Sequence, residues 1–521
     1  MSQHLPLVRS PQMAAIDRAT IKSGIPGPDL MQRAGSAVWS AAVDHFDLRA
    51  DTDLLFLCGK GNNGGDGFVA ARLASMAGFT PTVVLLADET AVRGDARHHL
   101  DELKASGVAI KTNRDAKLGE AIAKAHIVFD AMLGTGVEGD LRPPFVEAVT
   151  ALIHASAPIL AVDVPSGMNA DTGSGECADA DLTVTFGGYK PAHIFSPGRE
   201  RCGVRVTADI GLDTSAVDSG KSALVGFAAS EPSLPVRPRT AHKGDAGRVT
   251  VVAGSVGMTG AASLTSEAAL RSGAGLVTLG LPESLNDIAE VKLTEVMTLP
   301  LPEVRRRRCL SLRARGLILE ACSGATSVAI GPGLGRHHET KELVRRLIDD
   351  IDVPTVVDAD ALNAFEGAPQ LLEAAEQPLI LTPHPGEYRR LVGSPVSDPI
   401  EDAKKLSETT GATVILKGAP TVIASPESDA IVNLSGNPGM ATGGTGDVLT
   451  GITAGLLAQG VSTEEAASIA TYWHGLAGDL AAGRLGERGL LAGDIVSAIP
   501  ESERLMAVGE STKRYATYLP L

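Results

Sequence analysis

A chain of 521 residues with a formal net charge of −16 lacks the basic surface that nucleic-acid binding requires, and its length suffices for two or more domains. It contains no apolar run near the ~18 residues of a membrane-spanning helix, and its first residues lack the basic-then-apolar order of a secretory signal. The five cysteines are odd in number and show no CxxC spacing, which predicts reduced thiols in a cytoplasmic protein without a disulfide framework or a zinc site.

The first half of the chain alternates short apolar runs with helical patterns. We predict strands at 54–57, 82–86, 127–130, 159–162 and 182–186, and helices at 93–105, 118–125 and 145–154. Alternation at this spacing predicts a parallel sheet with helices on both faces. Ligands of such sheets bind beyond the carboxyl ends of the strands.

Polar segments follow three of these strands, and we expect them to line one pocket. They are the segments 59–67, 130–136 and 163–167. The glycines of the first segment match the dinucleotide fingerprint, but Asp66 would place a carboxylate where the pyrophosphate should bind. We predict that Asn62, Asn63 and Asp66 lie on one tight loop, and together they better suit a hydroxyl-bearing ligand or a hard cation with oxygen ligands.

The alternation lapses between residues 211 and 245. Pro232, Pro235 and Pro238 mark an extended connector there, so we divide the chain into domains of residues 1–225 and 226–521. A second alternating series begins at 247–254, with further strands predicted at 276–279, 328–330, 355–358, 379–381 and 413–416. The loops of the two halves differ in kind, which indicates a fusion of two different α/β domains.

Polar clusters also lie at the strand ends of the second half. They are 242–245, 257–262, 331–335, 358–363, 382–387 and 417–421. Each alone is compatible with turn chemistry, but six of them in one domain predict a ligand site. His384, between two prolines, either fixes a turn or contacts the ligand, and we favour the contact. Lys417 directly follows an apolar strand, which favours a phosphate contact over a snorkelling surface lysine.

The one basic cluster, Arg305–Arg308, is predicted to be a solvated loop or helix face.

The most informative segment of this half is Asn437–Asp447, which is glycine-rich and leads into an apolar run predicted as a buried helix. Backbone N–H groups at a helix N-terminus form an anion site. Asp447 would repel a phosphate there unless it takes a proton from a substrate hydroxyl while the loop holds a nucleotide. A simple N-cap is the alternative, but four glycines and two threonines in eight residues exceed what a cap needs.

Residues 437–451 resemble the glycine-rich signature of the ADP/ATP-dependent NAD(P)H-hydrate dehydratases, and the other polar clusters of that half fit this family in the same order. The segments 61–67, 130–136 and 163–167 resemble the NAD(P)H-hydrate epimerases. The resemblance covers roughly residues 10–505, and both halves in one chain is the arrangement of the bacterial bifunctional nicotinamide-nucleotide repair enzymes. It implies a Rossmann-like three-layer α/β domain followed by a ribokinase-like α/β domain.

The resemblance also implies the reactions. The substrates would be NADHX and NADPHX, which are NADH and NADPH hydrated on the nicotinamide ring. The first domain would interconvert the R and S epimers. The second would use ADP, with Mg²⁺ as its expected companion, to dehydrate the S epimer and release AMP and phosphate. A homo-oligomer without nucleic-acid or membrane partners is expected.

The site residues follow from the same resemblance. Those implied to hold the hydrated cofactor in the first domain are Asn62, Asn63, Gly64, Gly65, Asp66, Gly134, Thr135, Gly136, Val137, Glu138, Gly139, Asp140 and Asp163. Those implied to ligate potassium are Asn63, Asp130 and Ser166. In the second domain Ala262, Gly333, His384 and Asp447 would touch the hydrated cofactor, and Lys417, Gly418, Ala419, Pro420, Thr421 and Gly446 would bind ADP. Asp447 is the implied base and Asp163 the implied proton shuttle.

Two other readings compete with this one. A vitamin or sugar kinase of the ribokinase type, fused to a Rossmann-like binding domain, explains the second half but leaves the Asn62–Asp66 segment without a role. A binding or scaffold protein is disfavoured because Asp66, Asp130 and Asp163 are all present. Fold analogy alone does not separate these readings.

Overall fold

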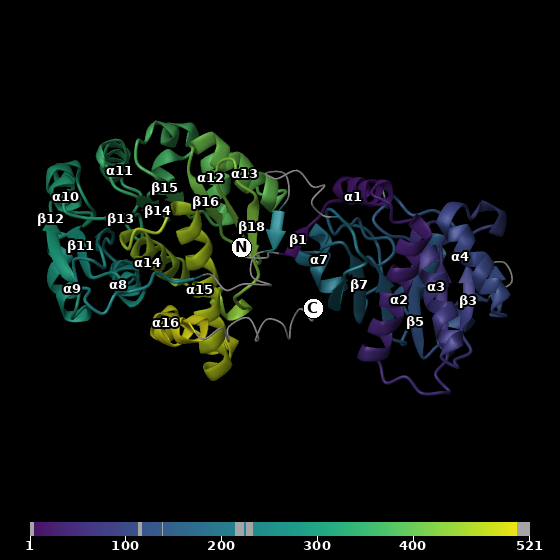
Figure 1. Cartoon of the computed structure of the whole chain (residues 1–521). Helices are drawn as coiled ribbons and strands as arrows, with labels where there is room; N and C mark the ends of the chain where they lie inside the picture. The colour runs from purple at the N-terminus through teal and green to yellow at the C-terminus, as the bar shows by residue number, and fades with distance from the viewer. Residues whose placement is uncertain (1–4, 113–116, 138, 214–222, 226–232, 508–521) are drawn as a thin grey trace. The chain divides into compact units, whose positions relative to one another are not determined.

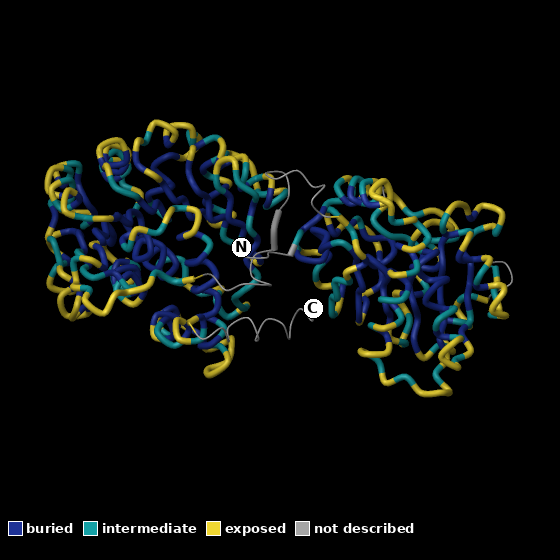
Figure 2. Tube along the Cα trace, viewed as in Figure 1, coloured by how far each residue is buried: buried dark blue, intermediate teal, exposed yellow. Residues whose placement is uncertain are grey.

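The computed structural model describes residues 5–112, 117–137, 139–213, 223–225 and 233–507, so Glu138 and Pro232 lie outside the described residues. The chain forms two compact units, one beginning at Leu5 and the other at Ala223 (Figure 1). Among the described helices, none is both long and apolar enough to cross a membrane. Each unit has its own buried sheet beneath more exposed helices (Figure 2).

The first unit is built on a parallel sheet in the order β4-β3-β2-β5-β6-β7-β8. The strands are β2 (Leu54–Cys58), β3 (Thr82–Leu85), β4 (Ile110–Thr112), β5 (Ile127–Ala131), β6 (Ile159–Val162), β7 (Leu182–Phe186) and β8 (Val204–Ala208). The five strands predicted from the apolar runs are confirmed. The chain order reverses between β2 and β5, and a crevice for ligands is expected at this reversal, beyond the carboxyl ends of the strands.

Helices cover both faces of this sheet. They are α2 (Gly27–His45), α3 (Asn62–Met76), α4 (Gly94–Ala105), α5 (Leu118–Lys124) and α6 (Phe145–Ile153), with α1 (Ser10–Lys22) and the short α7 (Pro191–Ile194) near the strand ends. Alternate residues of β2 point to opposite faces. Phe56 joins the core under α2, α3 and α4, while Leu55 and Leu57 join the core under α5 and α6. The short β1 (Leu5–Leu7) runs beside Tyr189.

The segment Asn62–Asp66 was predicted as a tight loop, and this was wrong, because helix α3 already begins at Asn62. Glycines explain the early start. A Cβ on Gly64 would lie 1.9 Å from the carbonyl oxygen of Gly59, so this turn packs against the loop only without a side chain there. The amides and Asp66 are therefore fixed on the first turns of a helix.

The second unit has a mixed sheet in the order β9-β18-β17-β16-β15-β14-β13-β10-β11-β12. The strands are β9 (Ala223–Val225), β10 (Arg248–Val252), β11 (Leu276–Pro282), β12 (Met297–Leu301), β13 (Ser327–Ile330), β14 (Thr355–Val357), β15 (Leu379–Leu381), β16 (Thr413–Leu416), β17 (Thr421–Ala424) and β18 (Ala430–Asn433). Strands β10 to β16 are parallel, and β17 is antiparallel to both of its neighbours. The predicted strands are confirmed, and β9, β12, β17 and β18 are additional.

The helices of this unit are α8 (Thr259–Arg271), α9 (Asn286–Lys292), α10 (Arg315–Cys322), α11 (His338–Asp350), α12 (Pro385–Val392), α13 (Pro399–Thr410), α14 (Thr445–Ala458), α15 (Thr463–Leu485) and α16 (Ala492–Ala507). Helix α14 is buried from Val448 to Ala458, as its apolar sequence predicted. It approaches α8 closely, since a Cβ on Gly451 would lie 2.2 Å from the carbonyl oxygen of Thr265. This packing fixes where the N-terminus of α14 points.

Candidate active sites

A cavity of about 470 Å³ lies at the chain reversal of the first unit. The residues of the predicted site that line it are Asn62, Asn63, Asp66, Gly134, Thr135, Gly136, Val137 and Asp163. Gly64 and Gly65 are buried within α3 instead, and Gly139 and Asp140 lie outside the cavity lining. Asp17, Asp95 and Lys190 also line the cavity, although no sequence pattern singled them out.

Asp163 and Lys190 form a buried ion pair on the cavity wall. The Nζ atom of Lys190 lies 2.6 Å from Oδ1 of Asp163, and the Thr185 hydroxyl donates to the same oxygen at 2.9 Å. Burial alone would raise the pKa of Asp163, but the ammonium of Lys190 outweighs it and the pKa is lowered. Asp163 is therefore an ionised carboxylate. Its backbone is left-handed, with φ of 67°.

Asp66 and Asp17 have the opposite character. Burial raises the pKa of Asp66 well above its ordinary value, and the negative charges of Asp163 and Asp17 raise it further. Burial also raises the pKa of Asp17, against the opposing field of Lys190. The cavity thus holds an ionised carboxylate next to carboxyl groups whose pKa values are raised. Such a divergence of pKa values is the usual arrangement for separate acid and base roles.

Asp130 and Ser166, two of the three implied potassium ligands, are in direct contact. The Ser166 hydroxyl donates to Oδ1 of Asp130 at 2.5 Å, and the Ser166 backbone N–H donates to Oδ2 at 2.8 Å. Burial raises the pKa of Asp130 to about 6, although the hydrogen bonds from Ser166 lower it. The third residue, Asn63, has a buried side-chain nitrogen without a hydrogen-bond partner among the described residues, and its Oδ1 lies beside Gly134.

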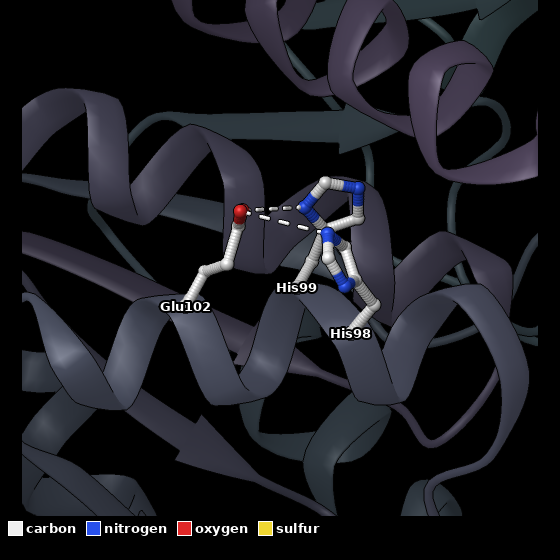
Figure 3. Close-up of side chains that lie close together, drawn as sticks. All are labelled: His98, His99 and Glu102. Atoms are coloured by element: carbon white, nitrogen blue, oxygen red, sulfur yellow. Dashed lines mark hydrogen bonds and ion pairs between the residues drawn. The ribbon is translucent and has the colours of Figure 1, made fainter.

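A group of possible metal ligands that was not predicted from the sequence lies on α4 (Figure 3). His99 Nδ1 is 3.1 Å and His98 Nε2 is 3.5 Å from the carboxylate of Glu102. Arg72 already neutralises that carboxylate at 2.9 Å, and His99 Nε2 lies 2.9 Å from the carbonyl oxygen of Pro28. We interpret the group as a polar cluster that fixes α4 against the start of α2, which lines the cavity.

In the second unit a partly buried lysine joins the loops that follow β14, β15 and β16. Lys417 Nζ lies 2.8 Å from Oδ1 of Asp358 and 3.7 Å from Oε2 of Glu387. The Thr450 hydroxyl of α14 donates to the other oxygen of Asp358 at 2.7 Å. Burial would raise the pKa of Asp358, but Lys417 lowers it, so this pair is ionised. The segment Lys417–Thr421 is a hairpin turn between β16 and β17.

Asp447 lies in the first turn of α14, which begins after Gly444 with φ of +99°. A Cβ on Gly446 would lie 3.2 Å from Lys417 Nζ, so the ammonium is next to the backbone of this turn. Burial raises the pKa of Asp447 to about 7, and the charge of Asp358 adds to this while Lys417 opposes it. The arrangement combines an anion site, a cation and a carboxylate that titrates near neutral pH.

The remaining predicted residues surround this group. His384 begins α12, and its Nε2 lies 3.4 Å from Oε1 of Glu387; burial and the charge of Lys417 lower its pKa. Gly333 packs against the segment before α8, because a Cβ there would lie 2.9 Å from the carbonyl oxygen of Met258. Ala262 is buried on the first turn of α8.

Sequence reasoning did not assign Lys190, Asp17, Asp358 or Glu387 to a site. Asp358 and Glu387 were within polar clusters at strand ends, so position alone could have identified them. Lys190 follows β7 in the same way, after Gly187 and Gly188, but no charge pattern marks it. Asp17 is on α1, outside the strand–helix series.

Both units match protein-family models. The model described as YjeF-related protein N-terminus matches residues 27–192, and the model described as NAD(P)H-hydrate dehydratase matches residues 249–501. The bifunctional NAD(P)H-hydrate repair enzyme Nnr of Moorella thermoacetica is 40% identical over 525 residues, which cover 96% of this chain and 99% of the relative. The enzyme of the same name from Coxiella burnetii is 36% identical over 498 residues, with coverages of 94% and 97%.

A solved structure is similar to the second unit. It is the ADP/ATP-dependent NAD(P)H-hydrate dehydratase of Bacillus subtilis, co-crystallized with ATP and Mg²⁺. It is 31% identical, covers 52% of this chain and 94% of its own, and aligns with a TM-score of 0.45.

Two unlike α/β units, each with buried carboxylates and a lysine at the carboxyl edge of its sheet, define a two-domain enzyme with two separate chemistries. The similarity over nearly the whole chain then gives the family. The chain belongs to the bifunctional NAD(P)H-hydrate repair enzymes. The predicted resemblance and the predicted fold class, Rossmann-like followed by ribokinase-like, are confirmed. Membership of this family disfavours the vitamin or sugar kinase.

Proposed function

We propose that residues 1–225 interconvert the R and S epimers of NADHX and NADPHX, and that residues 226–521 dehydrate the S epimer with ADP. The observation that carries the second assignment is Asp447 beside Lys417 at the start of α14. A base and a phosphate site in contact suit the phosphorylation of a hydroxyl group. The homo-oligomeric state and the cytoplasmic location stay predictions.

In the proposed dehydration, Asp447 takes the proton of the ring hydroxyl as its oxygen attacks the terminal phosphoryl group of ADP. AMP leaves, and the backbone N–H groups of the α14 turn and Lys417 stabilise the negative charge that develops on the phosphoryl oxygens. The phosphate group then leaves, since it is a better leaving group than hydroxide, the adjacent ring carbon loses a proton to the departing phosphate, and the new C=C bond restores the dihydropyridine ring. His384, Gly333 and Ala262 would position the ring.

Mg²⁺ would accompany ADP, and the donors present fit it. Mg²⁺ prefers one or two carboxylates together with substrate phosphates. Glu387 offers a buried carboxylate whose pKa burial raises, although Lys417 opposes this, and it lies next to the proposed phosphate site. Bound there, the ion would neutralise phosphate charge, while Lys417 would contact the phosphoryl group directly.

In the proposed epimerisation, Asp163 and Asp66 have separate roles. The resemblance implied Asp163 as the proton shuttle, but Lys190 holds it ionised, so we propose instead that it stabilises positive charge that develops on the ring. Asp66, whose pKa is raised by burial, would exchange a proton with the hydroxyl oxygen on the nicotinamide ring. The amides of Asn62 and Asn63 and the backbone of Gly134–Val137 would hold the cofactor in the cavity.

We also propose a potassium ion near Asp130. The oxygens of Asn63, Asp130 and Ser166 are hard donors that carry one formal charge, which is too little to favour a divalent ion. The donors fit, because Asp130 and Ser166 are in contact and Asn63 has a buried side-chain nitrogen without a hydrogen-bond partner among the described residues. A cation would keep Asp130 ionised despite its burial and hold the start of α3 against the loop after β6.

Replacing potassium with tetramethylammonium should slow epimerisation about tenfold or more, because a bulky cation cannot enter a site of this size. Asp130→Ala should cause the same loss and remove the remaining dependence on potassium. Epimerisation would be followed by chromatography of the two epimers, with dehydration in the same samples as the control. An epimerisation rate that is unaffected by both changes would contradict the proposal of a potassium ion at this site.

Dehydration should depend on pH through Asp447. A general base must be deprotonated, so kcat/KM should rise with pH through an apparent pKa of about 7 and level off above it. Asp360 raises the pKa of Asp447, so Asp360→Asn should move the rising limb to lower pH. Glu366→Gln, on an exposed loop, is the matched control. One group titrates over about two pH units. A flat profile between about pH 6 and 8 would therefore contradict the assignment of Asp447 as the base.

The proposed function is tested by mixing the protein with both NADHX epimers and ADP, and following the return of dihydronicotinamide absorbance. Complete conversion of both epimers requires both activities. Conversion of the S epimer alone would retain the dehydratase and reject the epimerase. A vitamin or sugar kinase would leave the hydrate unchanged and phosphorylate another alcohol.

A further inference from the structure

The loop Arg305–Arg308, after β12, presents cations that the proposed chemistry does not use. Arg305, Arg306 and Arg307 are exposed, and none of them makes an ion pair or a side-chain hydrogen bond with another described residue. Adjacent like charges repel one another, and in a chain with a net charge of −16 unpaired cations are conspicuous. Such a cluster is well suited to a phosphate group.

The loop is fixed at the carboxyl edge of the sheet by Arg308. The Val256 backbone N–H, in the segment after β10, donates to the Arg308 carbonyl oxygen at 3.1 Å. The Arg308 guanidinium donates to the hydroxyl and carbonyl oxygens of Ser284, after β11, both at 2.9 Å. The neighbouring acid, Glu303, accepts from the Ser284 hydroxyl at 2.7 Å. Arg308 therefore holds the loop, and the three preceding arginines are left for a ligand.

The same edge carries the proposed substrate side of the dehydratase site. The Ser255 hydroxyl donates to the carbonyl oxygen of Gly333 at 2.8 Å, so the segment that holds Arg308 also contacts a proposed substrate residue. In the sheet order β13-β10-β11-β12, three strand spacings separate Gly333 from the arginines, roughly 14 Å. An extended dinucleotide covers that span.

The arginines lie on the side of the site that is remote from ADP. The Lys417 turn follows β16, which is separated from β13 by β15 and β14 in the opposite direction along the sheet. Lys292 of α9, the helix between β11 and β12, donates to the Thr259 hydroxyl at the start of α8, at 3.2 Å. This places a second cation, close to a helix N-terminus, where the pyrophosphate of the substrate would pass. The loop Arg305–Arg308 follows β12, which is the next strand of the sheet after β11.

We propose that Arg305, Arg306 and Arg307 bind the 2′-phosphate on the adenosine ribose of NADPHX and give the dehydratase site a preference for NADPHX over NADHX. The proposal rests on the proposed function, because it places the dinucleotide across the edge from β13 to β12. The two substrates differ only by this dianionic group, so a cluster of exposed cations at the far end of the site is sufficient to distinguish them.

The test is the triple variant Arg305→Gln/Arg306→Gln/Arg307→Gln in the full chain. The KM for S-NADPHX should rise about tenfold or more while kcat, the KM for S-NADHX and the KM for ADP stay within about twofold. The matched control is Arg346→Gln/Lys405→Gln/Arg484→Gln, which removes the same charge from exposed positions on α11, α13 and α15. It should change none of these constants.

Binding of NADPH and NADH, measured by calorimetry, separates this proposal from the assignment of the reaction. The triple variant should lose affinity for NADPH and not for NADH, whether or not the protein turns over a hydrate. Equal losses for both dinucleotides would assign the arginines to the pyrophosphate and overturn the proposal. Unchanged NADPH binding, or a rise confined to the KM for ADP, would also overturn it.

Discussion

Asp447→Asn should lower the kcat of dehydration by about 10²–10⁴-fold, because it removes the base and retains the anion site. The asparagine keeps the shape of the side chain, and Lys417 and the N–H groups of α14 remain in place. The dissociation constant for ADP, measured by calorimetry, should therefore stay within severalfold of the native value. Absorbance at the dihydronicotinamide band gives the rate.

Epimerisation in the same preparation is the internal control for Asp447→Asn, since its proposed site is in the other unit. It should be unchanged. A variant that dehydrates normally but no longer binds ADP would show that Asp447 serves the nucleotide and that another group is the base.

Lys190→Met should abolish epimerisation and destabilise the first unit. Lys190 is 1% exposed, and its removal leaves Asp163 as a buried carboxylate without its counter-ion. Loss of one partner of a buried pair costs about 3–5 kcal/mol. Denaturant unfolding of the full chain should show this loss in the transition of the first unit, while dehydration of the S epimer continues.

The double variant Lys190→Met/Asp163→Asn separates stability from catalysis. With no charge left to bury, it should recover most of the lost stability and yet remain inactive in epimerisation. If either variant epimerises within twofold of the native rate, the ion pair is structural and the proposed role of Asp163 is wrong.

The strands could be predicted because both faces of a parallel sheet are covered by helices. Each strand is then a continuous apolar run in the sequence. β12 was missed because Pro300 interrupts its pattern, and a proline is tolerated there only because β12 is an edge strand. α14 was predicted correctly because its glycine-rich loop and apolar run point to the same structure.

The sites were predictable where chemistry and strand ends coincide, as at Asp447 and Lys417. The start of α3 was not predictable, because the close approach of Gly64 to the carbonyl oxygen of Gly59 is a property of the packed structure. Lys190 was missed for a similar reason. Its position beside Asp163 depends on how β6 and β7 pair, and no short sequence segment contains both residues.

The backbone of Asp163 has a consequence for protein engineering. A residue with a side chain in the left-handed region is strained by roughly 1–2 kcal/mol, and glycine is not. A design procedure that scores backbone strain alone would therefore favour glycine at position 163. That change would leave Lys190 as a buried cation without its counter-ion, which costs about 3–5 kcal/mol and outweighs the strain relieved, and it would remove the carboxylate proposed for epimerisation. Attempts to make this chain heat-resistant should keep position 163 fixed and seek their gains elsewhere.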